Sequence, residues 1–186
     1  MIIGLVGYAR SGKDTVADYL VQNHGFVRSA FADPMREALL KLDPRINVGE
    51  MLGVSLKEAV ANLGWDNLKT YSPDVRHLLQ RMGTEVGREM FGENIWVDKA
   101  MEIIKITENV VFSDVRYHNE ADAILGAGGI LWRITRPNVG PVNSHGSELL
   151  MDSYPQHKFS SHLFNSKNID YLQDIINRNI SEVKGS

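Results

Sequence analysis

The chain has 186 residues, of which 43% are hydrophobic and 23% charged, as is typical of one globular domain with a single core. Its net charge of -3 gives no overall attraction to nucleic acid or to an anionic membrane, so neither is expected as a partner. The absence of cysteine excludes disulfides, thiolate metal sites and a cysteine nucleophile. No apolar run approaches the roughly 20 residues that cross a bilayer, and the N-terminus lacks a signal-peptide pattern, so we expect a cytoplasmic protein.

The first half of the chain alternates strand and helix patterns. Strands are expected from their apolar runs, and helices from apolar residues three or four apart and from capping residues such as Ser72 before Pro73. In chain order we expect a strand at 2–6, a helix from 13, a strand at 26–31, a helix capped by Asp33 with Leu39 and Leu42 inward, a loop at 43–54, a helix from Ser55, and a helix from Ser72 that breaks or restarts near Gly83 and Gly87.

The second half continues the alternation and contains one irregular excursion. Residues 136–161 are rich in Pro, Ser, Gly and His, which favours a loop with short helical pieces. Around it we expect a helix at 95–106, a strand at 110–112, a helix that ends in the glycines of 126–129, a strand at 130–134, a short strand at 163–164 and a last helix at 169–183. This order predicts a mostly parallel sheet that is covered by helices on both faces.

A glycine-rich loop, GYARSGKDT at residues 7–15, joins the first strand to the first helix. The spacing G-x-x-x-x-G-K is that of a phosphate-binding loop, in which glycines turn backbone N–H groups inward, the helix adds its positive dipole end and a lysine reaches the terminal phosphates. Gly7, Gly12 and Lys13 occupy these positions. Arg10 adds a positive charge that could stabilise a phosphoryl group during its transfer; the alternative is an exposed loop arginine with no such role.

Magnesium ligands are expected near the same loop. Asp14 stands where a hydroxyl residue is usual and Thr15 follows it, while Asp114 ends a later strand. These three are candidate ligands of the metal or of its waters. For Asp14 a carboxylate that stabilises the first helical turn is the alternative, and for Asp114 a cap of the next helix.

Seven arginines are expected in or beside loops and helix ends, where a planar, always charged guanidinium could clamp the phosphate of a second substrate. They are Arg36, Arg76, Arg81, Arg88, Arg116, Arg133 and Arg136.

Six blocks in fixed order give a more specific resemblance. They are GYARSGKDT, SAFADPMRE, LLQRMGTEVGREMFGENIWV, FSDVRYHNEADAI, HGSE and LFNSKNIDYL, and they span residues 2 to about 178. In content and order they resemble the bacteriophage deoxynucleoside monophosphate kinases, of the group that includes adenylate kinase and dephospho-CoA kinase. The resemblance implies an α/β P-loop NTPase fold with a five-stranded parallel sheet (1–32 and 107–186), a helical acceptor-binding insertion (about 33–106) and a short lid (about 136–161).

The resemblance also implies roles for particular residues. The donor nucleotide would contact the loop residues Gly7, Ala9, Arg10, Ser11, Gly12, Lys13, Asp14 and Thr15, with Arg136, Ser144, His145, Ser147 and Glu148 in the lid and Asn165 beside the adenine. The acceptor would contact Phe31, Asp33, Pro34, Arg36, Gln80, Gly83, Thr84, Arg88, Trp96 and Arg116. Core packing is the alternative for Phe31 and Trp96, helix-end hydrogen bonding for Gln80 and Thr84, and a plain solvated loop for the lid.

The expected reaction transfers the γ-phosphoryl group of ATP, with Mg²⁺, to a deoxynucleoside monophosphate. Lys13, Arg10, Arg88, Asp114 and Arg116 would align the reactants and neutralise charge. A homodimer is compatible with the sequence, and the compartment would be a host cytoplasm if the chain is encoded by a phage. The alternatives are another small-molecule kinase of the dephospho-CoA or phosphomevalonate type, a nucleotide-binding switch without an acceptor and, less favoured by the acidic balance, a nucleic-acid end kinase.

Overall fold

The computed structural model describes residues 1–140 and 150–185. The chain forms two compact units, one made of Met1–Phe31 and Met101–Ser186 and the other of Ala32–Ala100. Each unit has a hydrophobic core of its own, in place of the single core that the chain length suggested.

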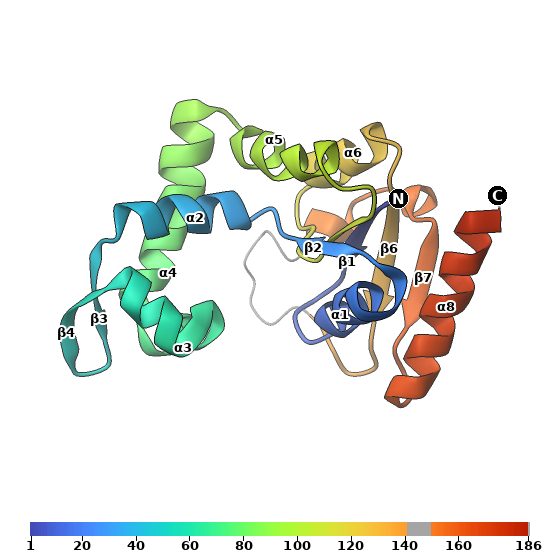
Figure 1. Cartoon of the computed structure of the whole chain (residues 1–186), viewed down its shortest axis with the longest axis horizontal. Coiled ribbons are helices and arrows are strands. Elements are labelled where there is room, and N and C mark those ends of the chain that lie inside the picture. Colours follow the sequence, from blue (N-terminus) through green and yellow to red (C-terminus); the bar gives the residue numbers. More distant parts are fainter. Residues whose placement is uncertain (141–149, 186) are drawn as a thin grey trace. The chain divides into compact units, whose positions relative to one another are not determined.

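The first unit contains a five-stranded sheet in the order β2-β5-β1-β6-β7, in which every neighbouring pair is parallel (Figure 1). The strands are β1 (Ile2–Val6), β2 (Val27–Ser29), β5 (Val110–Phe112), β6 (Ile130–Thr135) and β7 (Ser161–Phe164). The predicted sheet is therefore confirmed. Parallel neighbours need long crossover connections, which here include helices that lie on the faces of the sheet.

Helices cover both faces of this sheet (Figure 1). Ile3 and Leu5 point to one face and pack against buried residues of α1 (Lys13–His24) and α8 (Ile169–Gly185). Gly4 points to the other face, where a Cβ atom added to it would lie 2.6 Å from Ile124 of α6 (His118–Gly126). Since side chains alternate along a strand, this three-layer packing follows from the apolar run of β1.

The excursion after β6 contains two short 3₁₀ helices in its described part, η3 (Leu150–Asp152) and η4 (Gln156–Lys158). A third, η2 (Glu102–Lys105), follows α5 and precedes β5. The predicted lid residues Ser144, His145, Ser147 and Glu148 lie outside the described residues.

The second unit is mainly helical and has one antiparallel hairpin. Its elements are α2 (Asp33–Leu42), β3 (Arg45–Val48), β4 (Met51–Ser55), α3 (Leu56–Tyr71), α4 (Pro73–Gln80), the π-helical segment η1 (Arg81–Phe91) and most of α5 (Ile95–Met101). Ser55 and Ser72 cap α3 and α4 as predicted, by accepting hydrogen bonds from the N–H groups of Glu58 and Val75.

The loop predicted at 43–54 is wrong, because these residues form the β3–β4 hairpin. In β3 the buried Ile46 and Val48 alternate with exposed Arg45 and Asn47, which is the period of a half-buried strand. Gly49, with φ 57°, then supplies the turn. This alternation is only four residues long. The glycine and polar residues around it favoured a loop more strongly than so short an alternation favoured a strand.

The predicted break near Gly83 and Gly87 is also wrong. The helix continues through both glycines as η1 and ends at Gly92, which has φ 109°. A glycine inside a helix costs only about 1 kcal/mol relative to alanine, so tertiary packing can override its tendency to break the helix.

At α2 the capping position is Ala32 rather than Asp33, and Leu42 is exposed rather than inward. Leu39 is the residue of this helix that reaches the core. Throughout the two described stretches, we find no helix with both the length and the apolar character needed to span a membrane.

Candidate active site

The phosphate-binding loop runs from the end of β1 into α1, at the carboxyl edge of the parallel sheet. This edge is where ligands of open α/β sheets bind. Arg10 has φ 66°, an unusual value for a residue with a side chain, and Gly12 has φ 107°. The loop therefore turns tightly through two left-handed positions before the helix begins at Lys13.

Two glycines of this loop are required by close contacts. A Cβ atom on Gly7 would lie 2.4 Å from the carbonyl oxygen of Ile134, a backbone atom of the neighbouring strand. A Cβ atom on Gly12 would lie 2.5 Å from Nδ2 of Asn165. Backbone atoms of β6 and a side chain from beyond β7 thus fix the path of the loop.

Asn165 stabilises the loop, since its buried amide donates a hydrogen bond of 3.0 Å to the carbonyl oxygen of Ser11. The Ser11 hydroxyl is buried, and it has no hydrogen-bond partner in the described structure. Asn165, predicted to border the donor adenine, therefore contacts the phosphate loop itself.

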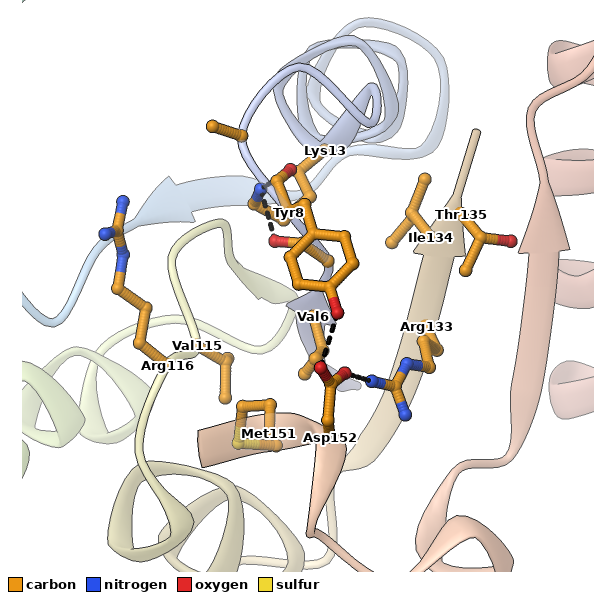
Figure 2. A pocket seen from close by; sticks show the side chains of 12 residues that line it. Val6, Tyr8, Lys13, Val115, Arg116, Arg133, Ile134, Thr135, Met151 and Asp152 are labelled. Carbon is orange, nitrogen blue, oxygen red and sulfur yellow. Dashed lines mark hydrogen bonds and ion pairs between the residues drawn. The ribbon is translucent and has the colours of Figure 1, made fainter. Parts of the chain in front are cut away.

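A pocket lies beside this loop in the first unit, and Lys13 reaches into it. The Lys13 ammonium donates hydrogen bonds of 2.8 Å to the carbonyl oxygens of both Gly7 and Tyr8. The pocket lining comes from β1 and the loop, the turn after β5, the end of β6 and η3; it comprises Val6, Gly7, Tyr8, Ala9, Lys13, Val115, Arg116, Arg133, Ile134, Thr135, Met151 and Asp152 (Figure 2). Three basic side chains thus line the pocket together with one acidic side chain.

Asp14 and Thr15 do not line this pocket. The carboxylate of Asp14 forms an ion pair with Arg28 of β2, which also binds Asp18 at 2.8 Å and Ser113 at 3.2 Å. Burial is the largest single influence on Arg28 and lowers its pKa, but the contacts with Asp14 and Asp18 together outweigh it, so the pKa is raised. Arg28 therefore neutralises two acidic residues of the phosphate-loop helix, and nothing in the sequence pattern indicated it.

Asp114 and Arg116 lie in the turn after β5. A carboxylate oxygen of Asp114 accepts a hydrogen bond of 2.7 Å from the backbone N–H of Phe31, which ties the ends of β5 and β2 together. The buried carboxylate of Glu120 accepts hydrogen bonds from the N–H groups of Arg116 and Tyr117, at 2.7 and 3.1 Å. Glu120 thus takes part in the capping box of α6, whose N-cap is Tyr117, and holds the backbone from which the Arg116 side chain projects.

Two other predicted residues of the first unit lie away from the pocket lining. Phe31 is buried and stacks on Phe112, with ring centroids 4.7 Å apart, so the alternative of core packing describes its position. Arg136 is exposed after β6, and its carbonyl oxygen accepts a hydrogen bond from the N–H of Val139.

In the second unit, Trp96 packs closely against η1. Its indole N–H donates a hydrogen bond of 3.0 Å to the carbonyl oxygen of Gly83. A Cβ atom on Gly87 would lie 2.2 Å from the same nitrogen, so only glycine permits this contact. At Gly83 the nearest atom is the sulfur of Met35 at 3.0 Å. The two glycines therefore provide the surface on which the half-buried Trp96 rests.

Arg36 lies over the ring of Trp65, with its guanidinium carbon 5.9 Å from the ring centroid. It also contacts Asp33 at 3.4 Å, at the long end of ion-pair distances, and its Nε atom is buried without a partner in the described structure. Trp65 follows the kink at Gly64 in α3 and was not identified from the sequence. The remaining candidates of this unit are Pro34 in α2, the exposed Arg76 and Gln80 in α4, and the exposed Arg81 and Thr84 and the half-buried Arg88 in η1.

Three pocket residues that were not assigned to the predicted donor or acceptor site contact one another. Tyr8 is the variable second residue of the loop, Arg133 was one of seven candidate arginines, and Asp152 lies in the irregular excursion. The Tyr8 hydroxyl donates a hydrogen bond to Asp152, which also forms an ion pair with Arg133 (Figure 2). Only the position of Arg133 at the end of a strand could have indicated this group.

A second polar cluster holds the segment that carries Asp152. The carboxylate of Asp122 in α6 accepts hydrogen bonds from the Tyr154 hydroxyl at 2.6 Å and the Lys158 ammonium at 3.0 Å. These two hydrogen bonds lower the pKa of Asp122. Burial, and then the bond to Asp122, raise the pKa of Tyr154. The cluster anchors residues 154–158 to α6.

Oxygen donors near the loop fit a hard divalent cation. Over residues 1–140 and 150–185 there is no group of three or more His, Asp or Glu side chains that could bind a metal without a substrate. Magnesium commonly binds through one or two carboxylates together with water and substrate phosphates. Thr15 and Asp114 supply donors of the required kind.

Comparisons with known proteins agree with this geometry. Residues 1–62 match the sequence model of the family described as "Deoxynucleotide monophosphate kinase". Over 184 residues, the chain is 30% identical to a protein of Acanthamoeba polyphaga mimivirus named "Putative deoxynucleotide monophosphate kinase", with 91% of each chain covered.

Among solved structures, the fold is similar to that of a dephospho-CoA kinase from Campylobacter jejuni. The TM-score is 0.53 at 12% sequence identity, and the match covers 98% of this chain and 96% of that one. The predicted P-loop kinase fold is thereby confirmed. Because the mimivirus relative matches over nearly its whole length, the chain belongs to the deoxynucleotide monophosphate kinase family and is an enzyme that phosphorylates a substrate.

Proposed function

We propose that this enzyme transfers the γ-phosphoryl group of ATP to the 5′-phosphate of a deoxynucleoside monophosphate, giving ADP and a deoxynucleoside diphosphate. The observation that carries the proposal is the phosphate loop with Lys13 at a basic pocket, in a chain of this family. A mimivirus relative supports a viral source, and we propose a phage or another virus and hence a host cytoplasm.

On the donor side, the loop residues Gly7, Ala9, Arg10, Ser11, Gly12 and Lys13 are proposed to hold the triphosphate of ATP. The Lys13 ammonium donates hydrogen bonds to two carbonyl oxygens of the loop, which keep it at the edge of the pocket. Backbone N–H groups at the start of a helix of 12 residues add to this attraction. Asn165 is proposed to stabilise the loop rather than to contact adenine, and Arg136 to approach the nucleotide from the described end of the excursion.

Thr15 and Asp114 are proposed to hold Mg²⁺ when ATP is bound. The ion would neutralise phosphate charge as the phosphoryl group moves. Asp14 is less suited to this role, because Arg28 already occupies its carboxylate. We therefore assign Asp14, with Arg28, to the stability of the first turn of α1.

On the acceptor side, the second unit offers arginine and aromatic side chains of the kind that bind a nucleoside monophosphate. Arg36 is proposed to bind the acceptor phosphate and Arg88 to reach the same group, while Asp33 and Pro34 shape the start of α2. Trp96 is proposed to border the base or sugar, with Gln80, Gly83 and Thr84 near it. A phosphate oxygen is already a nucleophile at neutral pH, so the reaction needs no strong general base.

Catalysis then depends on alignment and charge. The acceptor and donor both carry negative charge, and the reaction brings these charges together. Lys13, Arg10, Arg88 and Arg116 are proposed to neutralise them, while Asp114 acts through the metal. Glu120 contributes indirectly, since it fixes the backbone of Arg116.

The test is ADP formation from ATP and Mg²⁺ with each of the four deoxynucleoside monophosphates and each of the four ribonucleoside monophosphates. Turnover that requires a deoxynucleotide is the expected result. An acceptor-free reaction is the control, because equal ADP formation without acceptor would instead support a nucleotide switch. Turnover with dephospho-CoA or phosphomevalonate alone would favour the other small-molecule kinases.

Partners beyond nucleotides are not required by this proposal. A homodimer remains a proposal that sedimentation of the purified chain would test, and we expect no nucleic acid or membrane to bind.

A further inference from the structure

Tyr8, Arg133 and Asp152 form one connected group inside the pocket beside the phosphate loop. In Figure 2 the Tyr8 hydroxyl and the Arg133 guanidinium approach Asp152 from different sides, and the dashed lines join both to its carboxylate. The three residues come from the loop, from β6 and from η3. The group therefore connects segments that are distant in the sequence.

The backbone of Arg133 lies directly beside the phosphate loop. In the parallel pairing of β1 and β6, Arg133 is the register partner of Val6, the last residue before the loop. The next residue of β6, Ile134, has the carbonyl oxygen that approaches Gly7 so closely that no side chain fits there. The position of Arg133 is therefore as firmly fixed as that of the loop itself.

Neutral groups also hold the Arg133 side chain. One guanidinium nitrogen donates a hydrogen bond of 3.1 Å to the Gln156 side chain, and the guanidinium carbon lies 5.3 Å from the ring centroid of Phe159. The side chain is only 14% exposed. Gln156 and Phe159 carry no charge, so they position the guanidinium without neutralising it. The positive charge of Arg133 is balanced by Asp152.

Asp152 carries a negative charge at a pocket whose other charged lining residues, Lys13, Arg116 and Arg133, are all basic. One oxygen of its carboxylate binds Arg133, and a phosphate oxygen could take that place, since a guanidinium donates hydrogen bonds to either anion. A triphosphate held by the loop would bring several negative charges close to this carboxylate. Like charges in a partly desolvated pocket repel strongly, so both anions are not expected to keep their places.

We propose that Arg133 is a further phosphate-binding residue for the donor nucleotide, and that Asp152 occupies it until a donor phosphate displaces the carboxylate. The proposal rests on the proposed function only in requiring a donor with a phosphate chain. Displacement leaves Arg133 in position, because Gln156 and Phe159 remain. A buried guanidinium requires an anionic partner, and the phosphate chain supplies it.

Binding of ATP and of inorganic tripolyphosphate, each with Mg²⁺ and without an acceptor, tests this competition by calorimetry. Tripolyphosphate reports on the phosphate contacts alone. Asp152→Asn removes the competing charge and should tighten both ligands by about threefold to tenfold, whereas Arg133→Gln should weaken both by about tenfold or more. In the double variant the gain from Asp152→Asn should disappear. Lys41→Ala, at an exposed ion pair of α2 that has no role in this site, is the control and should change affinity by less than about twofold.

The opposite signs of the two single substitutions are decisive. If Asp152 and Arg133 form a permanent structural ion pair, both substitutions weaken or spare binding together, and that result would overturn the proposal. Asp152→Ser is tested in parallel with circular dichroism of each variant, so that a folded neutral replacement is available. Failure of every deoxynucleotide to act as acceptor would refute the proposed reaction but would leave these binding measurements valid.

Discussion

The phosphate loop and the Trp96 contact in the second unit both depend on glycines, but they are built in different ways. At the loop, Gly7 is confined by a backbone carbonyl of β6, and Lys13 is held by two further carbonyls. At Trp96, Gly87 makes room for the indole ring, and the carbonyl oxygen of Gly83 accepts its N–H hydrogen bond. Backbone contacts give a site that any triphosphate fits, whereas side-chain contacts give a surface whose shape changes with each substitution. We therefore expect substitutions in the loop to weaken donor binding and those around Trp96 to weaken acceptor binding.

The largest effect should follow from Lys13→Ala, which removes the ammonium from the backbone-built site. We expect turnover with ATP and the best deoxynucleotide to fall by roughly a hundredfold to a thousandfold, because one charged donor to a developing anion is lost. Steady-state ADP release measures it. Lys41→Ala, at an exposed residue of α2, is the control. Near-normal turnover in a folded Lys13→Ala protein would remove this residue from the mechanism.

Gly7→Ala should have the next largest effect. The added methyl group would collide with the carbonyl oxygen of Ile134, and because that oxygen belongs to the sheet the loop must shift instead. We expect ATP affinity to fall by about tenfold or more, as measured by calorimetry. Gly126→Ala, where an added Cβ meets no atom within 4 Å, is the matched control. Unchanged affinity would show that the loop path is not set by this contact.

Gly87→Ala tests the side-chain-built region. The new methyl group would overlap the Trp96 indole and displace it, so we expect the KM for the acceptor to rise by about tenfold while the KM for ATP stays within about twofold. Gly83→Ala meets only the flexible end of Met35 and should have a smaller effect. A rise in the KM for ATP alone would contradict the assignment of Trp96 to the acceptor.

The smallest expected effect is on the stability of the fold. It is tested by comparing the carboxylate of Asp122, which is held by two hydrogen bonds, with the exposed carboxylate of Asp66. Asp122→Asn should lower the free energy of unfolding by less than about 1 kcal/mol at neutral pH, since the side chain is 55% exposed and solvent screens its contacts. The folded pKa of Asp122 is below its usual value of about 3.9. Its stabilisation is therefore fully present above that value and is lost as the pH falls through the folded pKa.

Urea unfolding at a series of pH values measures this difference. The gap between the unmodified protein and Asp122→Asn should close on acidification. Asp66→Asn, at an ion pair whose carboxylate side chain is 94% exposed, should show almost no gap at any pH. A gap for Asp122→Asn that widens toward acid pH would mean that the pKa shift has the opposite sign.

Most elements of the first unit could be predicted from the sequence, because the patterns that indicate them are local. The apolar run of β1, the loop glycines and the spacing of Val16 and Leu20 each lie within a few residues, and they predict strand, loop and helix without reference to the rest of the chain. The sheet followed from their repetition. By contrast, Gly87 breaks helices by its own propensity, and only its contact with Trp96 explains why η1 continues through it.

The parts that the sequence did not predict depend on contacts between distant segments. Arg28 meets Asp14, Tyr8 meets Asp152 and Asn165 meets Ser11, and none of these pairs has a spacing that marks it. Asp14 is an example. Its position next to Lys13 predicted a metal ligand, because the sequence does not show that Arg28 forms an ion pair with it. A local motif thus identifies the chemistry of the loop but not the residues that neutralise or support it.

The support of the loop by Ile134 and Asn165 has a consequence for the synthesis of the protein. The carbonyl that confines Gly7 and the amide that holds Ser11 leave the ribosome more than a hundred residues after the glycine motif. Domains complete their folding only when their last contacting segment is available. We therefore expect nascent chains that end before residue 165 to lack tight nucleotide binding, so that the donor site forms only after the segment that contains Asn165 has been made.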